Sequence, residues 1–345
     1  MTMADDTQRS GHVPTLADVA RAARVSSATV SRCLNEPHRV TRQTRERVMR
    51  VVRELGYAPN FGARALAARR TDTFGAVIPT MDNAIFARGL QAFQEEMGRH
   101  GITLLVASSS YDPGLEQEQI RNLAARGVDG VMLIGHDRPE DSYRLLQRRG
   151  VPYVVTWSHD PSQPHPSIGF DNRKAMMALM EQVIRLGHRH VGLLSGVRYG
   201  NDRARLRAEG VAESMQRAGI AADNLTTVEA RYSIDAGAAG FAQLMQRRPR
   251  PTVVVCGNDV LAAGALRQAR AMGLNVPGDV SITGFDDIDL AEIVTPGLTT
   301  VHVPHRQMGR GAAEILMKLR DGQDPVPPVE LKASILWRES LGAAP

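Results

Sequence analysis

The chain of 345 residues contains only two cysteines and lacks long apolar runs. Cys33 and Cys256 lie far apart and outside any paired-thiol or metal-ligand spacing, so we expect two reduced thiols. No stretch approaches the roughly 18 apolar residues that a membrane span requires, so we expect no membrane partner. Residues 1–11 are polar and lack the apolar segment of a secretory signal peptide, which predicts a cytoplasmic location.

The sequence also lacks the motifs that nucleotide-dependent and hydrolytic enzymes need. No phosphate loop or dinucleotide glycine fingerprint follows an expected strand, and Ser195-Gly196 is not part of a nucleophile elbow. The histidine pairs have no acidic or thiol partner at metal-ligand spacing. These pairs are His188 with His190, His159 with His165, and His302 with His305. We therefore expect a non-enzyme without cofactor or metal.

Positive charge is concentrated in the first fifth of the chain. Residues 1–70 contain thirteen arginines, no lysine and six acidic residues, a net charge of +7. The whole chain carries +5, which leaves −2 for residues 71–345. Because basic side chains that displace counterions provide most non-specific DNA affinity, a basic module beside a near-neutral body indicates phosphate binding. A solvated basic helix face is the alternative.

Two short helices joined by a tight turn are predicted within this basic module. Residues 16–23 have apolar side chains on one face, with Thr15 as the N-cap. After a brief turn, Ser26 caps a second helix over residues 27–34, and a third helix follows Thr41 until Gly56 ends it. This pattern is typical of a helix-turn-helix.

The segment closely resembles the DNA-binding headpiece of the lactose/galactose repressor (LacI/GalR) family. The residues that carry the resemblance are Thr15–Ala20, Val25–Arg32, Arg45–Val48 and Leu55–Asn60. The resemblance implies that the second helix enters the major groove of operator DNA, with Ser27, Ala28 and Arg32 at base-reading positions. Arginine can grip guanine bidentately, serine can donate or accept, and alanine can contact the thymine methyl group. A purely structural role is the alternative for Arg32 and Ala28.

The same resemblance implies further DNA contacts. Ser26, Thr29 and Ser31 are suited to phosphate contact or helix capping. The remaining members of the implied set are Thr15, Asn60, Arg64 and Leu66. In this family the stretch after the headpiece is a hinge helix that pairs with its dimer mate in the minor groove and wedges a leucine between base pairs, a role that falls on Leu66.

The rest of the chain alternates short apolar runs with longer helical patterns, which predicts parallel sheets covered by helices on both faces. The predicted strands are Gly75–Pro79, Thr103–Ala107, Gly130–Ile134, Val151–Trp157, Val191–Ser195, Thr252–Cys256 and Val280–Gly284. The predicted helices are Ile85–Arg99, Gln117–Arg126, Lys174–Arg185, Arg205–Ala218, Val260–Met272 and Arg306–Leu319. Ligands of such open sheets bind beyond the carboxyl ends of the strands.

The resemblance extends over roughly residues 14–340 through five further blocks. These are Gly127–Gly130, Leu186–His190, Asn258–Gly264, Gly284–Asp287 and Leu298–Val301. It implies a core like that of periplasmic sugar-binding proteins, with two doubly wound parallel-sheet subdomains joined by three chain crossings. We expect these crossings near residues 158–162, 286–291 and 318–324. A leucine-heptad extension is missing after Ser340, which favours a homodimer.

The predicted organisation is a tail over residues 1–13, a helix-turn-helix headpiece over 14–59, a hinge helix and linker over 60–72, and a core over 73–345. Within the core, we expect one subdomain at about 73–160 and 290–320, and the other at about 161–288 and 322–340.

Family pocket positions fall on Arg207, Tyr232, Asn258 and Asp286, with Pro79, Thr156 and Phe170 at more variable cleft positions. Arg207 can clamp a carboxylate bidentately, Asn258 and Asp286 can bind paired hydroxyls, and Tyr232 offers a ring face to a sugar. The alternatives are a surface position for Arg207, helix capping by Asp286 and simple packing for Tyr232.

These expectations combine into a sequence-specific repressor that binds double-stranded operator DNA and responds to a small effector. The positions around Ile78–Thr80, Asn83–Ala87, Thr156-Trp157 and Gly169–Asn172 look most like the gluconate-type branch, so gluconate or a related sugar acid is the leading effector. A neutral sugar, a sugar phosphate and a purine-like corepressor stay open. The alternatives for the class are a cytoplasmic sugar-binding protein and a sugar-handling enzyme.

Overall fold

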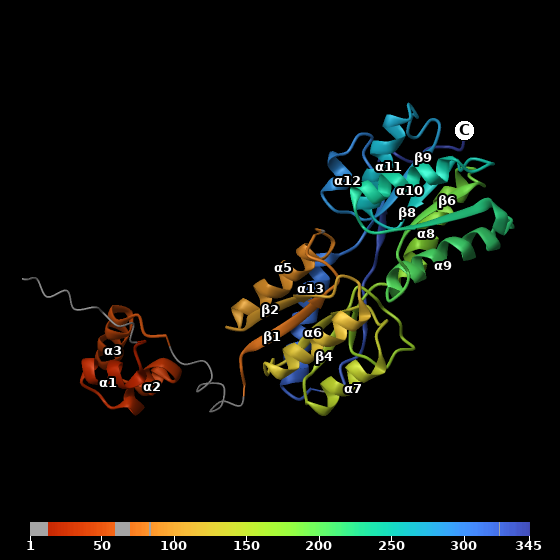
Figure 1. Ribbon diagram of the computed structural model, residues 1–345. Helices are drawn as coiled ribbons and strands as arrows, with labels where there is room; N and C mark the ends of the chain where they lie inside the picture. Colours follow the sequence, from red (N-terminus) through yellow and green to blue (C-terminus); the bar gives the residue numbers. More distant parts are fainter. Residues whose placement is uncertain (1–12, 59–69, 83, 324) are drawn as a thin grey trace, which may run out of the picture. The chain divides into compact units, whose positions relative to one another are not determined.

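The computed structural model describes residues 13–58, 70–82, 84–323 and 325–345 (Figure 1). Its contacts divide the chain into two compact units, Met1–Thr71 and Asp72–Pro345. Asn60, Arg64 and Leu66, which the resemblance assigns to a hinge helix, lie outside the described residues. No helix among the described residues is long and apolar enough to cross a membrane.

The described part of the first unit is a three-helix headpiece. It consists of α1 (Leu16–Ala23), α2 (Ser27–Asn35), a 3-10 turn η1 (Pro37–Arg39) and α3 (Arg42–Leu55). Thr15, Ser26 and Thr41 cap the three helices with their side chains, and Gly56 ends α3 in the left-handed conformation. Val19, Val30 and Val48 meet in a shared apolar core. The predicted helix-turn-helix and its caps are therefore confirmed.

The second unit contains two α/β lobes. The first, here called the N-lobe, has a six-stranded parallel sheet in the order β11-β5-β4-β3-β1-β2. Its elements are β1 (Thr73–Ile78), α5 (Ala84–Arg99), β2 (Thr103–Ser108), α6 (Pro113–Ala125), β3 (Val131–Ile134), α7 (Glu140–Arg148), β4 (Tyr153–Thr156), β5 (Ser167–Gly169), α13 (His305–Arg320) and β11 (Val329–Glu330).

Helices cover both faces of the N-lobe sheet. Phe93 of α5 and Leu316 of α13 belong to the apolar core of one face, and Leu123 of α6 and Leu146 of α7 to that of the other. The helices α5 and α13 cross so closely that a Cβ atom on Gly309 would overlap the backbone of α5.

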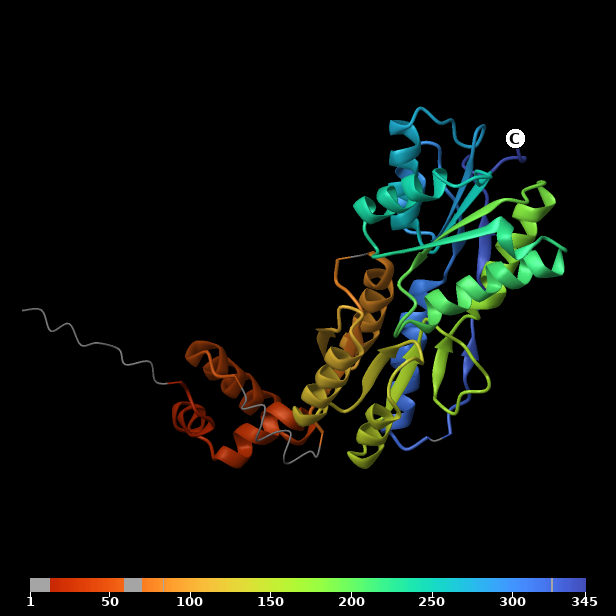
Figure 2. The ribbon, with the colours of Figure 1, turned by 45° about the vertical axis from the view of Figure 1, so that its right-hand side comes forward.

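The C-lobe repeats this plan with a six-stranded sheet in the order β12-β10-β9-β8-β6-β7, in which only β12 is antiparallel to its neighbour. Its elements are α8 (Asn172–Arg185), β6 (Val191–Gly196), α9 (Asp202–Arg217), η2 (Ala222–Asn224), β7 (Leu225–Ala230), α10 (Ile234–Met245), β8 (Val253–Cys256), α11 (Asp259–Ala271), β9 (Ser281–Asp286), α12 (Leu290–Ile293), β10 (Thr299–His302) and β12 (Ser334–Leu336). Figure 2 shows both lobes and the segments that join them. The predicted fold class is confirmed.

The predicted crossings between the lobes are wrong in position. The chain leaves the N-lobe after β5, at residues 170–171, returns after β10, at 303–304, and leaves again after β11, at 331–333. The expected positions were 158–162, 286–291 and 318–324. Three short strands, β5, β10 and β11, hydrogen-bond to the sheets beyond each expected boundary and so delay every crossing.

Candidate nucleic-acid interface and ligand cleft

The second helix of the headpiece presents a continuous exposed face. Ser27, Ala28 and Arg32 are exposed on α2, whereas Val30 and Cys33 on its other side are buried. Within the described headpiece, the Arg32 side chain takes part in no ion pair, so its guanidinium is available to a base edge.

The hydroxyl groups around α2 are used locally. Ser26 Oγ accepts a hydrogen bond from the Thr29 backbone N–H at 3.2 Å and contacts the Thr29 hydroxyl at 2.9 Å. Ser31 Oγ accepts from Asn35 Nδ2 at 3.3 Å. Thr15 forms a reciprocal capping box with Asp18 at the start of α1. These residues fix the helix ends, which leaves the face of Ser27, Ala28 and Arg32 as the candidate for base reading.

A small cavity of about 20 Å³ lies between the two lobes, at the carboxyl ends of their strands. The N-lobe contributes Ile85, Phe86, Tyr111 and Trp157, and the C-lobe contributes Asn201, Arg203, Arg207, Tyr232 and Asp286. In each sheet the strand order changes direction at the first strand, β1 or β6. Ligands of doubly wound folds bind at the carboxyl ends of the strands, at such a switch point. The volume accommodates about one water molecule.

Arg207 is the most heavily engaged side chain of the cavity. Its Nε donates to Asn172 Oδ1 at 2.8 Å and its Nη1 donates to the Gly257 carbonyl at 2.6 Å. Its Nη2 lies 3.5 Å from Asp286 Oδ1, and its guanidinium stacks 3.7 Å above the Phe285 ring. These partners hold the planar fork in one orientation at the back of the cavity.

Asp286 and Trp157 bring unsatisfied polar atoms to the cavity wall. Among the described residues, neither carboxylate oxygen of Asp286 has a hydrogen-bond partner, and the same holds for Trp157 Nε1. Asp286 is 1% exposed and Trp157 is also 1% exposed, so water does not satisfy these atoms freely. Both residues have positive φ angles, +101° and +59°, and strained backbone of this kind concentrates at functional sites.

Two tyrosines complete the polar wall. The Tyr111 and Tyr232 rings lie 5.5 Å apart, one from each lobe. Burial raises the pKa of both phenols, so both hydroxyls stay protonated at neutral pH and are able to donate hydrogen bonds.

The predicted effector residues fall into two groups. Arg207, Tyr232 and Asp286 line the cavity together, and Asn258 follows Gly257, whose carbonyl binds Arg207. Asn258 caps α11 with its side-chain oxygen, while its buried Nδ2 has no partner among the described residues.

Pro79, Thr156 and Phe170 are not among the residues that line this cavity. The Thr156 hydroxyl donates to the Leu133 carbonyl inside the sheet at 2.8 Å, and Phe170 stacks on Phe285 with ring centroids 5.9 Å apart. Pro79 is buried at the end of β1. Phe170 thus packs against Phe285, the ring on which the Arg207 guanidinium stacks.

Sequence reasoning missed Trp157, Tyr111 and Arg203. Arg203 precedes Arg207 by four residues, so both lie on the same face of α9, and that spacing was a usable signal. Trp157 directly follows the last residue of β4, and the carboxyl end of that strand also pointed to it. No sequence pattern marks Tyr111.

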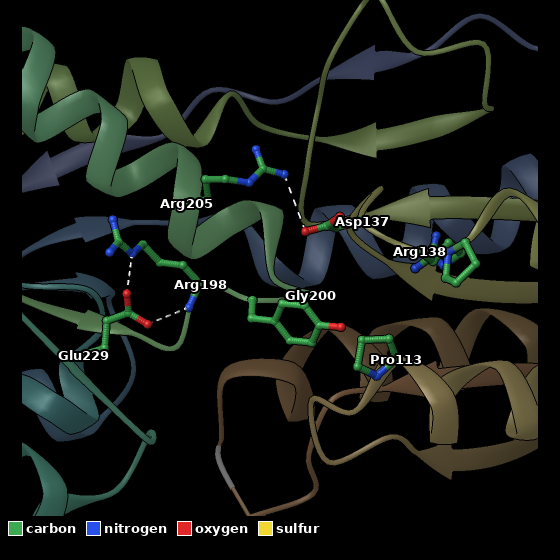
Figure 3. Close-up of a pocket in the computed structure, with 9 residues that line it drawn as sticks. Pro113, Asp137, Arg138, Arg198, Gly200, Arg205 and Glu229 are labelled. Atoms are coloured by element: carbon green, nitrogen blue, oxygen red, sulfur yellow. Dashed lines mark hydrogen bonds and ion pairs between the residues drawn. The ribbon is translucent and has the colours of Figure 1, made fainter.

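A second, larger pocket has a volume of about 740 Å³ (Figure 3). It is lined from both lobes by charged pairs. Arg205 lies 3.5 Å from Asp137 of the opposite lobe, and Arg198 contacts Glu229 of its own lobe at 2.6 Å. Each of these two cations thus already faces a carboxylate.

A helix-turn-helix headpiece with an exposed polar face on α2, followed by a two-lobed core with a polar cavity between its lobes, is the architecture of a DNA-binding regulator. Residues 15–60 match the bacterial regulatory proteins of the lacI family, and residues 180–341 match the periplasmic binding protein-like domain.

Known repressors resemble the chain over nearly its whole length. The HTH-type transcriptional repressor CytR of Escherichia coli (strain K12) is 32% identical over 309 residues, 90% of either chain. The lac repressor dimer bound to operator and the anti-inducer ONPF superimposes with a TM-score of 0.84 at 27% identity, covering 96% of this chain and 100% of that one. The transcriptional regulator CelR in complex with cellobiose has a TM-score of 0.69 at 30% identity, covering 95% and 99%.

The chain therefore belongs to the LacI family and is a DNA-binding transcriptional repressor rather than an enzyme.

Proposed function

We propose that the chain represses transcription as a homodimer on a pseudo-palindromic operator, with α2 of each headpiece in the major groove. The exposed face of Ser27, Ala28 and Arg32 supports this. Arginine and serine can hydrogen-bond to base edges, and the alanine methyl group can contact the thymine methyl group. Selection from random DNA followed by footprinting tests it. A two-fold site with half-sites spaced by whole helical turns is expected; binding to a single asymmetric half-site by one chain contradicts the proposal.

The cleft of this repressor takes a small, hydroxyl-rich effector. The observation that carries this proposal is that, among the described residues, neither carboxylate oxygen of Asp286 accepts a hydrogen bond and Trp157 Nε1 donates none. A hydroxyl group both donates and accepts, so neighbouring hydroxyls of one ligand satisfy both atoms. The aromatic rings around them are suited to the C–H faces of a sugar.

Charge balance favours a neutral effector over gluconate. The two cations of the wall already have carboxylate partners, since Arg203 contacts Asp202 at 2.8 Å and Arg207 lies 3.5 Å from Asp286. A sugar acid would place its carboxylate in a wall without spare positive charge and close to Asp286. Two arguments still favour gluconate: Arg207 could bind a carboxylate, and parts of the sequence resemble gluconate-type repressors. The experiment must therefore include gluconate.

A thermal-shift panel of D-glucose, cellobiose, D-gluconate, D-glucose 6-phosphate and adenine, a purine, tests the effector class. A ligand at 100 times its dissociation constant adds about 2.7 kcal/mol of stability, which is readily measured. We expect a neutral compound to raise the melting temperature and to change operator affinity. A larger shift with gluconate than with any neutral compound would overturn the proposal in favour of the sugar acid.

Asp286→Asn provides the matched variant. It keeps the side-chain shape, removes the negative charge and replaces one acceptor oxygen with an NH2 donor. We expect it to abolish the response to the neutral ligand. The control is Asp235→Asn, whose carboxylate is 90% exposed and pairs with Arg267 on the surface. Equal responses of both variants would remove Asp286 from the effector site.

A further inference from the structure

The first turn of α9 spans the cleft and binds a single loop of the N-lobe. Asp202 Oδ2 accepts a hydrogen bond from the His136 backbone N–H at 2.8 Å. Arg203 Nη1 donates to the Ile134 carbonyl at 3.1 Å and to Asp202 Oδ1 at 2.8 Å. Asp202 and Arg203 are only 4% and 7% exposed, so these charge-assisted bonds form away from bulk water.

The charges of this contact are matched internally. Burial alone would raise the pKa of the Asp202 carboxyl, but the Arg203 guanidinium and the His136 backbone N–H hold it below its usual range. Asp202 is therefore ionised at neutral pH and Arg203 is its counterion.

Gly135 is the residue that lets the two lobes meet here. It follows β3 with a φ of +72°, and a Cβ atom at this position would overlap both the Arg203 guanidinium and the Asp202 carboxylate. Any other residue would thus clash with the pair, in addition to being strained in the left-handed region.

Arg203 also lines the small cavity between the lobes. A cavity of about 20 Å³ has no room for a sugar-sized molecule, and ligand pockets usually measure about 300–1,000 Å³. Separation of the lobes, or displacement of Arg203, would make room for such a ligand. Both movements break the bond between Arg203 and the Ile134 carbonyl.

We propose that Asp202 and Arg203 form a latch that closes on the loop around Gly135, and that this latch sets the affinity of the cleft for its effector. The proposal rests on the effector site proposed above. The latched state excludes the ligand, so the measured affinity is the intrinsic affinity multiplied by the unlatched fraction. Weakening the latch raises effector affinity, although no ligand contact is gained.

Hydrogen–deuterium exchange of the full chain tests the latch without any ligand. The reporter is the peptide that contains the His136 amide, whose acceptor Asp202 stays unchanged in every variant. We expect Gly135→Ala to speed its exchange at least tenfold, because the added methyl group forces the latch open. The control Gly150→Ala has a similar φ of +62° but no atom within 4 Å of its Cβ, so it isolates the backbone strain.

A second pair of variants guards against misfolding of the glycine variant. Arg203→Met removes the buried cation of the latch, and Arg205→Met removes a half-exposed cation that pairs with Asp137 (Figure 3) and with Glu209. Fast exchange in Arg203→Met and wild-type exchange in Arg205→Met support the latch. Wild-type exchange in both Gly135→Ala and Arg203→Met overturns it.

The effector panel then tests the link between latch and affinity. A compound that stabilises the wild-type chain is expected to bind Gly135→Ala about ten times more tightly than Gly150→Ala. Equal affinities overturn the link while the proposed effector site stands. If no compound of the panel stabilises any variant, the proposed neutral effector is contradicted, and the exchange data alone decide whether the latch exists.

Discussion

Replacing Arg207 by alanine should lower the free energy of unfolding, because this side chain has several buried partners in the cavity. The variant leaves the buried Asp286 without its nearby cation and removes the donors to Asn172 and to the Gly257 carbonyl. Breaking one partner out of a buried ion pair costs about 3–5 kcal/mol, because the remaining charge stays desolvated. Against a typical stability of about 5–15 kcal/mol, this is a large loss.

The size of the coupling between the two charges separates this explanation from simple loss of packing. If the stranded carboxylate is the main cost, Asp286→Asn in the Arg207→Ala background should recover part of the stability. We expect an interaction energy of about 1–3 kcal/mol in the double-mutant cycle. Arg207→Lys should lie between wild type and alanine, because lysine keeps the charge but cannot reproduce the fork.

Urea unfolding followed by far-UV circular dichroism measures these differences, provided that the slope with denaturant stays constant among the variants. A loss below about 1 kcal/mol for Arg207→Ala, or strictly additive effects in the cycle, would refute the reasoning. The side chain would then be held by Phe285 stacking rather than by its charge.

Three further predictions concern other parts of the chain. Arg32→Ala should cost about 1–3 kcal/mol on the selected operator and little on random DNA, measured by titration at fixed salt; equal losses would reassign Arg32 to phosphate contact. Leu66→Ala should reduce the operator bend in a circular-permutation gel assay without changing dimerisation, and an unchanged bend would exclude a wedge. Burial lowers the pKa of His136 to about 4 in the folded chain. As pH falls, the imidazole is therefore protonated in the unfolded chain at a higher pH than in the folded chain. Stability should therefore drop between about pH 6.5 and 4, by up to about 1.4 kcal/mol per unit, and His136→Gln should flatten this slope in pH-dependent unfolding.

Local chemistry made the headpiece readable from the sequence. Thr15, Ser26 and Gly56 act through caps within a few residues, so their roles depend on neighbours along the chain rather than on distant packing. Most apolar strands and amphipathic helices of both lobes were also visible, although α7, β7 and α10 were not among the predicted elements. Arg207, Tyr232 and Asp286 line one cavity. They were predicted as pocket residues from the family resemblance and not from the periodicity of the sequence.

Long-range pairing explains what the sequence did not reveal. The strands β5 and β11 have three and two residues, too few for a period to emerge, and only their partners in the sheet define them. The resemblance implied a cleft position for Thr156, but its hydroxyl donates to the Leu133 carbonyl of the neighbouring strand. The role of Gly135 depends on a side chain of the opposite lobe, nearly seventy positions away along the chain.

The edge strands β11 and β12 have a consequence for the order in which the protein is built on the ribosome. The segment 329–336 supplies one strand to each sheet, and Ser340 then hydrogen-bonds to the Ile282 carbonyl and the Thr299 backbone N–H of the C-lobe. Neither sheet is complete until this segment has left the exit tunnel, long after the headpiece has emerged and been able to fold. A chain still under synthesis therefore carries a complete helix-turn-helix headpiece attached to two lobes that each lack an edge strand.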